Sequence, residues 1–597
     1  MSGDHGLSVP PPGDEPHPDG RSATSETRAL RRATRALRYH LDTLPVDYDL
    51  AVSADRFLAR LAFPFARQRY GCADSMIGAG FGGTVLGAMA RSLLDDGLRW
   101  LWIADQPERG RALLGALLDE RNRLCIALEK DDVSCGNLPR WLMPIPDVAD
   151  LTGNSLSWLD VPSMPSEEEL LHHFLVRPAD DPPPSPGDAS HTALLGKVRT
   201  LLNMSGLRGA VLILAHAGHG NYLGLQSSLT DDGTPGHDLR ADHEALFMQV
   251  AAVGVVATLL GTAATTPEAW PLDVEQEPFL QRAVELVENV TVAAVAIHGL
   301  GTSRRVVTLP KKNTSSRTKP LLRPGAVLAP EDLYPDVNSA DEVITEAETY
   351  VELARSLQVK LGKHGESPLH AIVGFGGAHS GLLTVMSTYD KPGSAVIGVF
   401  AARMLLEEAA RMGWRYSAGE ADAFKARTKH YFDEYRTKRK KTIALLVSSG
   451  VPVADAQKIF SWPDKVRVVT PDDEIDKGRP PLPSIGHMLH QMGERENFPE
   501  PGWLGVAYSL LSQITHSTPI GHLHTMRHLD GEWRLNELSP EMLSLTLDVT
   551  CLASAHTIGL SAAVLTEMSD ETTEFTKKLY RQAAVVHNAA RLVHGLD

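Results

Sequence analysis

Two histidine-bearing turns are the parts of this sequence best suited to chemistry. His216 lies in LILAHAGHGNYLGL, residues 212–225, and His516 lies in SQITHSTPIGHLHT, residues 512–525. In both, an apolar segment leads through a small residue to the histidine, then to a glycine-containing turn and a second apolar segment. An imidazole in such a place serves as a general base, a metal ligand or a hydrogen-bonded core residue.

Two segments with helical periodicity each carry an arginine followed four residues later by an acid. The pairs are Arg91 with Asp95 and Arg403 with Glu407, and the segments align at a constant offset of 312 (403 − 91). Residues four apart lie on one face of a helix and can form an ion pair. Such a pair is either a surface ion pair or a group held inside a helical bundle. We expect any active site where the shared histidine meets this Arg–acid helix.

The order of these features indicates an internal duplication. The two histidine turns are 300 positions apart (516 − 216), and the halves end in the similar sequences IHGL, residues 297–300, and VHGL, residues 593–596. We therefore predict a mainly α fold, with two related helical-bundle domains and long irregular insertions. The predicted parts are a disordered tail (1–23), a first helical domain (24–300), a basic linker (301–338) and a second helical domain (339–597).

Composition limits the classes of function. The chain has 597 residues and a net charge of −16, which argues against a generally positive surface for nucleic acid. The basic run at residues 436–441 is either a solvated helix face or a local RNA-binding edge. Four cysteines form no CxxC pair, which argues against a zinc knuckle or a disulfide framework and fits a reducing cytoplasm. The acidic N-terminal stretch lacks the order of a signal peptide.

The sequence contains one candidate membrane span and one glycine-rich segment that resembles a cofactor-binding motif. Residues 245–264 carry no charge and are long enough to span a bilayer. Their counterpart, residues 542–565, contains Asp548, and charge at mid-bilayer is costly, so we predict two buried core helices and no membrane. The GAGFGG sequence at residues 78–83 follows no convincing strand, and neither a Walker lysine nor an HExxH motif occurs. We therefore predict no cofactor and no metal.

Three segments carry a resemblance to known proteins. They are the helix ARSLLDDGLRWLWIAD at residues 90–105, the charged helix after it, and LSQITHSTPIGHLH at residues 511–524. Together they resemble helical bacterial domains of unknown function that are distantly similar to the HEPN superfamily. Members of that superfamily cleave or bind RNA. The resemblance therefore implies a helical fold and an RNA partner.

HEPN domains often place an arginine and a histidine on a C-terminal helix, separated by four to six residues. Arg581 and His587 match this pattern with five residues between them. The resemblance implies that the pair contacts a phosphate and moves a proton. The sequence departs from the pattern in two respects. A six-residue step turns through about 240° on a helix, and the first half has Glu285 and Thr291 at the corresponding positions.

The leading functional hypothesis is a HEPN-like cytoplasmic protein that binds or cleaves RNA in stress or defence. The alternative is a non-catalytic helical scaffold that binds a protein partner. A metal-dependent enzyme built on the histidine turns is the third hypothesis. The candidate catalytic residues are Arg581, His587, His216, His516, Arg91, Arg403, Asp95 and Glu407.

Overall fold

The computed structural model confirms the predicted mainly α fold. It describes residues 24–45, 54–77, 83–130, 164–166, 169–170, 173–174, 191–202, 210, 213–214, 239–267, 270–300, 339–357, 366–391, 393–416, 421–448, 450–461, 481–495, 503–529, 532–565 and 570–596. The predicted tail and the predicted linker lie outside these residues. So does His216, together with the turn around it.

The first half consists of a series of helices. In chain order they are α1 (Ser25–Asp42), α2 (Ala54–Met76), α3 (Gly83–Ala104), the 3-10 helix η1 (Pro107–Gly110), α4 (Arg111–Lys130), α8 (His191–Leu202), α11 (Ala241–Thr265) and α12 (Gln276–His298). α1 begins at Ser25, because Thr24 Oγ1 accepts a hydrogen bond of 3.2 Å from the N–H of Thr27. α2 contains Pro64 and continues to Met76.

The second half repeats this helical character and adds one hairpin. Its elements are α13 (Asp341–Arg355), α14 (Glu366–Thr388), α15 (Ala395–Tyr416), α16 (Ala421–Ser448), α17 (Val453–Lys458), α18 (Ile485–Arg495), α19 (Trp503–Thr515), α20 (Pro519–Leu523), β1 (Met526–Leu529), β2 (Glu532–Leu535), α21 (Pro540–Leu565) and α22 (Asp570–His594). β1 and β2 pair antiparallel, with Met526 opposite Leu535. The sequence does not predict this hairpin, because strands of four residues are too short to show a clear alternation.

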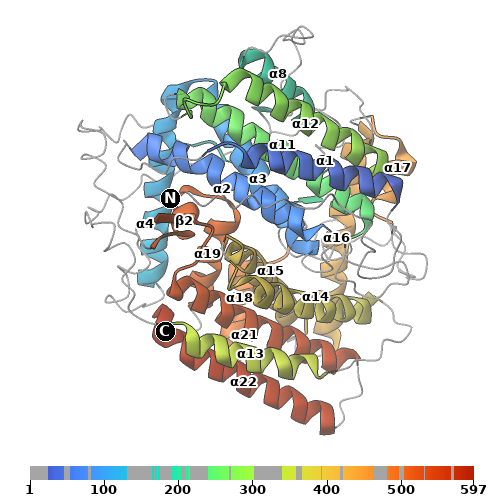
Figure 1. Cartoon of the computed structure of the whole chain (residues 1–597). Helices are drawn as coiled ribbons and strands as arrows, with labels where there is room; N and C mark the ends of the chain where they lie inside the picture. Colours follow the sequence, from blue (N-terminus) through green and yellow to red (C-terminus); the bar gives the residue numbers. More distant parts are fainter. Residues whose placement is uncertain are drawn as a thin grey trace.

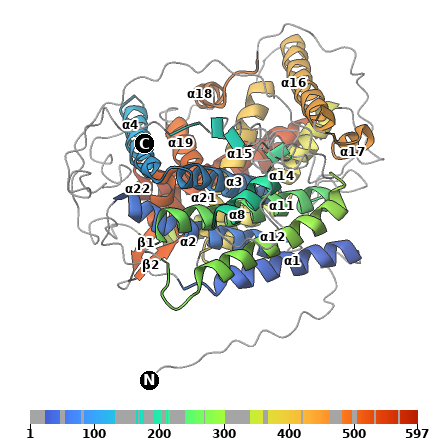
Figure 2. The ribbon, with the colours of Figure 1, turned by 90° about the horizontal axis from the view of Figure 1, so that it is seen from above.

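Each half is built around one helix that is buried on nearly all sides. α11 packs against α2, α3 and α12, and α21 packs against α14, α15 and α22 (Figure 1). Both helices are long and apolar enough to cross a membrane, but their apolar stretches lie within the protein. This is the arrangement of core helices in a soluble helical protein. Seen from above, α1 and α12 lie on the opposite side of the molecule from α16 (Figure 2).

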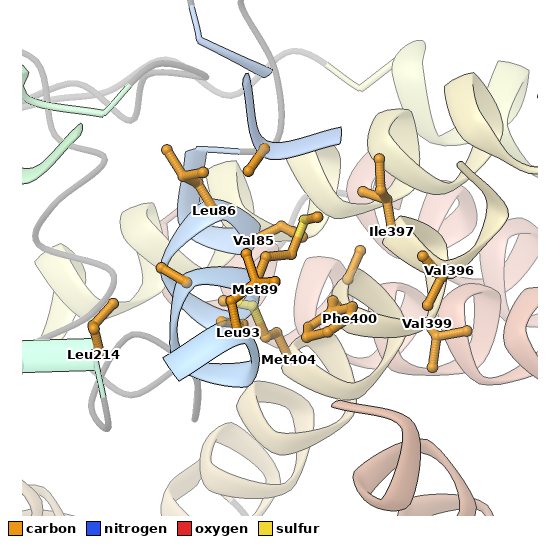
Figure 3. Close-up of a cluster of buried hydrophobic side chains, with 14 of the residues drawn as sticks. Val85, Leu86, Met89, Leu93, Leu214, Val396, Ile397, Val399, Phe400 and Met404 are labelled. Carbon is orange, nitrogen blue, oxygen red and sulfur yellow. The ribbon is translucent and has the colours of Figure 1, made fainter. Parts of the chain in front are cut away.

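The two halves share one hydrophobic core. A single cluster of buried apolar side chains contains residues from both halves. At their boundary α3 lies beside α15, and Met89 and Leu93 face Phe400 and Met404 (Figure 3). The two predicted domains therefore pack against each other directly, and α3 and α15 are the Arg–acid helices of the sequence.

Corresponding helices of the two halves match in length and spacing. α2 and α14 each have 23 residues, and their starts are 312 apart (366 − 54). α3 and α15 each have 22 residues, and their starts are also 312 apart (395 − 83). α12 and α22 end alike, since His298 Nδ1 and His594 Nδ1 accept the N–H of Leu300 and of Leu596 at 3.0 Å. These parallels agree with an internal duplication, which stays a prediction.

His298, the last residue of α12, makes the stability of the protein depend on pH. His298 lies with Nε2 2.9 Å from Gln249 Oε1, and burial lowers its pKa from 6.5 to about 4. Between these values the unfolded chain binds a proton that the folded protein does not, so the free energy of unfolding falls as the pH falls. One such proton changes it by up to about 1.4 kcal/mol per pH unit. We expect His298→Asn to flatten the dependence by this amount in urea unfolding at several pH values; equal slopes would contradict the assignment.

Candidate functional site

One segment of the second half contacts the Arg–acid helices of both halves. It runs from Trp503 to Leu523, and α19 packs against α15 and α3 while α20 packs against α4. The turn between α19 and α20 is tight because Thr518 Oγ1 caps α20, accepting the N–H of Gly521 at 3.2 Å. A Cβ at Gly521 would lie 2.2 Å from the carbonyl oxygen of Gln513, so glycine is needed for this close approach.

The α15 side of the segment is a buried ion-pair network. Glu407 Oε1 lies 3.0 Å from Arg403 Nη2, and Glu407 Oε2 lies 2.7 Å from Arg411 Nη2. From α19, Tyr508 donates its hydroxyl to Glu407 at 3.0 Å, and Ser512 Oγ accepts from Arg403 Nε at 3.1 Å. Burial opposes the charge of Arg411, but Glu407 outweighs it and raises the pKa of Arg411 above its ordinary value. The network holds α19 against α15.

The equivalent pair on α3 is simpler. Arg91 Nε lies 2.8 Å from Asp95 Oδ1, and the carboxylate is buried while the arginine is only partly so. Of the two alternatives that the sequence leaves open, the pair on α15 lies inside the bundle, and the pair on α3 is buried at its carboxylate only. The remaining polar residues of α3 belong to a second cluster.

We call this second cluster the Ser517 centre. It comprises Arg69 of α2, Ser92, Asp96 and Arg99 of α3, and Ser517 and His522 from the segment after α19. Arg69 Nη1 donates to Ser92 Oγ at 2.9 Å and also to Ser517 Oγ, and the two serine hydroxyls hydrogen-bond each other. Arg99 Nη1 donates to the carbonyl oxygen of Ser517 at 2.7 Å. The centre thus joins α2 and α3 to a turn more than four hundred residues away in sequence.

Backbone strain is concentrated on the partners of Arg69. Among the described residues, Ser517 and Asn536 are the two non-glycine residues with positive φ, at 49° and 54°. Both bind Arg69, since Asn536 Oδ1 accepts from its Nε at 3.4 Å. Residues other than glycine rarely adopt this conformation, and such strain is found disproportionately at functional sites.

Asp96 is the carboxylate around which the charged groups of the centre are arranged. Asp96 Oδ1 lies 2.9 Å from Arg99 Nη1 and 3.4 Å from His522 Nε2, and Asp96 Oδ2 lies 4.0 Å from Arg69 Nη1. Burial disfavours the carboxylate, but His522 and the two arginines outweigh it and lower the pKa of Asp96. Burial lowers the pKa of His522 below its ordinary value. At neutral pH the centre therefore holds a carboxylate and a neutral imidazole, a form that accepts a proton.

Three buried polar atoms of the centre have no hydrogen-bond partner within the described part of the chain. They are Nη2 of Arg69, Oδ2 of Asp96 and Nδ1 of His522. Arg69 is fully buried, and burial lowers its pKa to about 10, so it remains charged at neutral pH. The side chains of Arg99 and His522 keep 10% and 9% of their surface exposed, so the centre reaches solvent on that side.

A further acid from α4 adjoins the centre. Glu120 Oε2 accepts the N–H of Ile520 at 3.3 Å. Burial raises its pKa to about 7, against the opposing effect of Arg99. Burial therefore favours the neutral form of this acid more than in an exposed glutamate, which reduces the negative charge beside the two arginines.

The structure brings some predicted site residues together and separates others. Arg403 and Glu407 lie against α19, and His516 immediately precedes Ser517 in the turn. His216 lies outside the described residues, so its position relative to Arg91 and Asp95 is not defined. Sequence reasoning missed Ser517, although it lies within the THST turn that was singled out.

The HEPN-like pair does not converge. Arg581 is 73% exposed on α22 and lies 4.0 Å from Glu574. His587 is buried, with Nδ1 2.9 Å from Asp548 Oδ2 and its ring stacked on Trp503. The two side chains point to different environments, as a six-residue step on a helix dictates. This geometry is against the expected joint action of Arg581 and His587 on a phosphate.

The histidines and acids do not form a metal site in the described part of the chain, where no group of three His, Cys, Asp or Glu residues is arranged to hold an ion. Asp548, for example, accepts from both His587 and His594, so these ring nitrogens are turned to the carboxylate. His216 and His219 lie outside that part. The hypothesis of a metal-dependent enzyme gains no support from the residues that are described.

Comparison with known proteins does not assign the chain. No family model, curated protein or solved structure matches it, so its function has to be inferred from the Ser517 centre itself.

Proposed function

We propose that this protein binds RNA and that a phosphate group of the RNA is recognised at the Ser517 centre. The observation that carries the proposal is the buried guanidinium of Arg69, whose Nη2 has no hydrogen-bond partner among the described residues. A guanidinium fork binds phosphate oxygens through charge-assisted hydrogen bonds. The hydroxyls of Ser92 and Ser517, both bound to Arg69 Nη1, supply one further donor beside it, because one of the two donates to the other.

The same centre contains a group suited to proton transfer. His522 is oriented by Asp96 through Nε2, which leaves Nδ1 facing no partner within the described residues. A neutral imidazole beside a bound phosphate can act as a general base toward a ribose hydroxyl. We therefore place cleavage, if the bound RNA is cleaved, at His522. The choice of RNA over another phosphate ester, the cytoplasmic location and a role in stress or defence rest on the HEPN-like resemblance of the sequence.

Arg69→Lys tests the proposal. Lysine keeps the positive charge beside Asp96 but lacks the second nitrogen of the fork, so we expect RNA affinity to fall about tenfold or more. Affinity is measured by fluorescence anisotropy with a labelled single-stranded RNA at fixed salt. Arg67→Lys is the matched control, because Arg67 lies on the same helix and donates to the carbonyl oxygens of Leu41 and Leu44, outside the centre.

A cleavage assay on the same RNA separates the two candidate histidines. We expect His522→Gln to abolish cleavage and to leave binding within a fewfold of wild type. Arg581→Ala should leave both unchanged, since Arg581 lies on the surface of α22. Equal affinity of wild type and Arg69→Lys, or loss of cleavage in Arg581→Ala with full activity in His522→Gln, would contradict the assignment of the Ser517 centre.

A scaffold that binds a protein partner is the second candidate. Arg69, Ser92 and Ser517 are completely buried, which favours this candidate. A buried network of this kind needs no ligand, because fixing how the two halves pack is a sufficient role for it. In that case Arg69→Lys lowers the melting temperature and RNA is not bound by any form of the protein. Affinity purification of the wild type should then recover a stable protein partner.

A further inference from the structure

The exposed face of α1 is a basic stripe on an acidic protein. Arg28, Arg32 and Arg35 are exposed and follow one another at helical spacing, and Tyr39 completes the face with 54% of its surface exposed. We propose that a single strand of RNA lies along this stripe, with its phosphates on the three arginines and a base stacked on Tyr39. This inference rests on the proposed function, for which it names the surface that holds the strand.

The arginines of the stripe are not held in close ion pairs. None of the three pairs with a described residue within 4.0 Å, and Arg35 acts on Asp74 only at longer range, whereas Arg38, on the adjoining face, pairs with Asp74 at 3.4 Å and with Asp42 at 3.6 Å. The opposite face of α1 carries the buried leucines and packs against α12 and α2. The arginines of the stripe are therefore available to a partner.

The chemistry of the stripe favours a single-stranded polyanion. Tyr39 lies eleven positions after Arg28 (39 − 28), or about 16 Å along the helix axis, which is long enough for several nucleotides. Arginines bind the phosphates, and an exposed aromatic ring stacks on a base, which a duplex keeps inside its own stack. A membrane surface is not favoured, because the apolar face of α1 is already packed within the protein and cannot insert.

The experiment measures RNA affinity as a function of salt. For a single strand, each phosphate contact contributes about 0.7 to the slope of log affinity against log salt. Replacing Arg28, Arg32 and Arg35 together with glutamine is expected to lower the slope by about 2 and the affinity by tenfold or more at low salt. Tyr39→Ala should weaken binding about fivefold or more without changing the slope, since stacking releases no counterions. Circular dichroism checks that each variant is folded.

A matched control removes the same charge elsewhere. Lys438, Lys440 and Lys441 are exposed on α16, on the opposite side of the molecule in Figure 2. Their joint replacement by glutamine is expected to change the slope by well under 1. A larger effect from α16 than from α1 would overturn the inference and would restore the basic run at residues 436–441 as the RNA-binding edge.

The outcomes separate this inference from the proposed function. If the wild type binds RNA and Arg69→Lys weakens it, but the α1 substitutions change neither slope nor affinity, the α1 inference is wrong and the Ser517 centre stands. If the wild type binds no RNA, both are wrong. If duplex RNA binds as tightly as the single strand and Tyr39→Ala has no effect, the stripe does not hold a single strand.

Discussion

Replacing Gly254 with alanine is expected to lower the free energy of unfolding by about 3 kcal/mol. Gly254 lies in the middle of α11, where α11 crosses α3. A Cβ there would lie 2.5 Å from the carbonyl carbon and the carbonyl oxygen of Leu93 and 2.7 Å from the nitrogen of Leu94. These are backbone atoms, so the clash is relieved only by separating the two helices.

The same contact is tight from the other side. A Cβ at Gly97 of α3 would lie 2.6 Å from the carbonyl oxygen of Gly254. α3 carries Ser92, Asp96 and Arg99, so the close approach of α11 also sets the position of the Ser517 centre. We therefore expect Gly254→Ala to weaken RNA binding as well, if the centre binds RNA as proposed.

Gly398→Ala on α15 is the matched control. The chemical change is the same and the residue is also buried within a helix, but a Cβ at Gly398 would meet its nearest neighbour, Val385, at an ordinary 3.6 Å. Alanine is favoured over glycine in a helix by about 1 kcal/mol, so this variant should be as stable as the wild type or more stable. Urea unfolding measures both. Similar losses for the two variants would show that glycine flexibility, rather than helix contact, governs the effect.

Local patterns in the sequence predicted most helices, since each depends on residues close together in the chain. Asp548 inside α21 was the reason to predict a core helix there, and the structure buries this acid between His587 and His594. The hydrophobic periodicity of α3 and α15 likewise identified the Arg–acid helices correctly.

The candidate site could be predicted only in part, because its contacts are long-range. Arg69 and Ser517 are separated by 448 positions, and nothing in the sequence around either residue indicates the other. The turn that contains His516 lies beside α3, where Arg99 binds the carbonyl oxygen of Ser517, and a meeting of His516 itself with an Arg–acid helix stays a prediction. The segment that contains this turn contacts helices of both halves because α3 packs beside α15. No local pattern in the sequence predicts that packing.

Two sequence matches had no structural counterpart. The GFGG sequence at residues 374–377 lies within α14, whereas Gly83, the last residue of the GAGFGG sequence, is the first residue of α3, so the two are not equivalent. Arg581 and His587 match the spacing of a family motif, but helix geometry already placed them on different faces. In both cases the position within an element was more informative than the letters.

Glu407→Gln is expected to lower the free energy of unfolding by about 3 to 5 kcal/mol. Glu407 is fully buried and lies within 3.0 Å of both Arg403 and Arg411, so one carboxylate compensates two buried guanidinium groups. The glutamine amide keeps the shape of the glutamate side chain but removes its negative charge, so both arginines lose the charge that compensates them. The measurement is urea unfolding at neutral pH. A loss below 1 kcal/mol, the range of an exposed ion pair, would contradict this account.

Asp95→Asn is the matched comparison for Glu407→Gln. Asp95 occupies the equivalent place on α3, but it pairs with Arg91, whose side chain is partly exposed, so we expect a smaller loss than for Glu407→Gln. On α15 the motif is used to hold α19 against the core. On α3 the neighbouring Asp96 and Arg99 bind the turn at Ser517 instead. A larger loss at Asp95 than at Glu407 would reverse this division, in which the second half supplies the structural network and the first half supplies the helix of the candidate site.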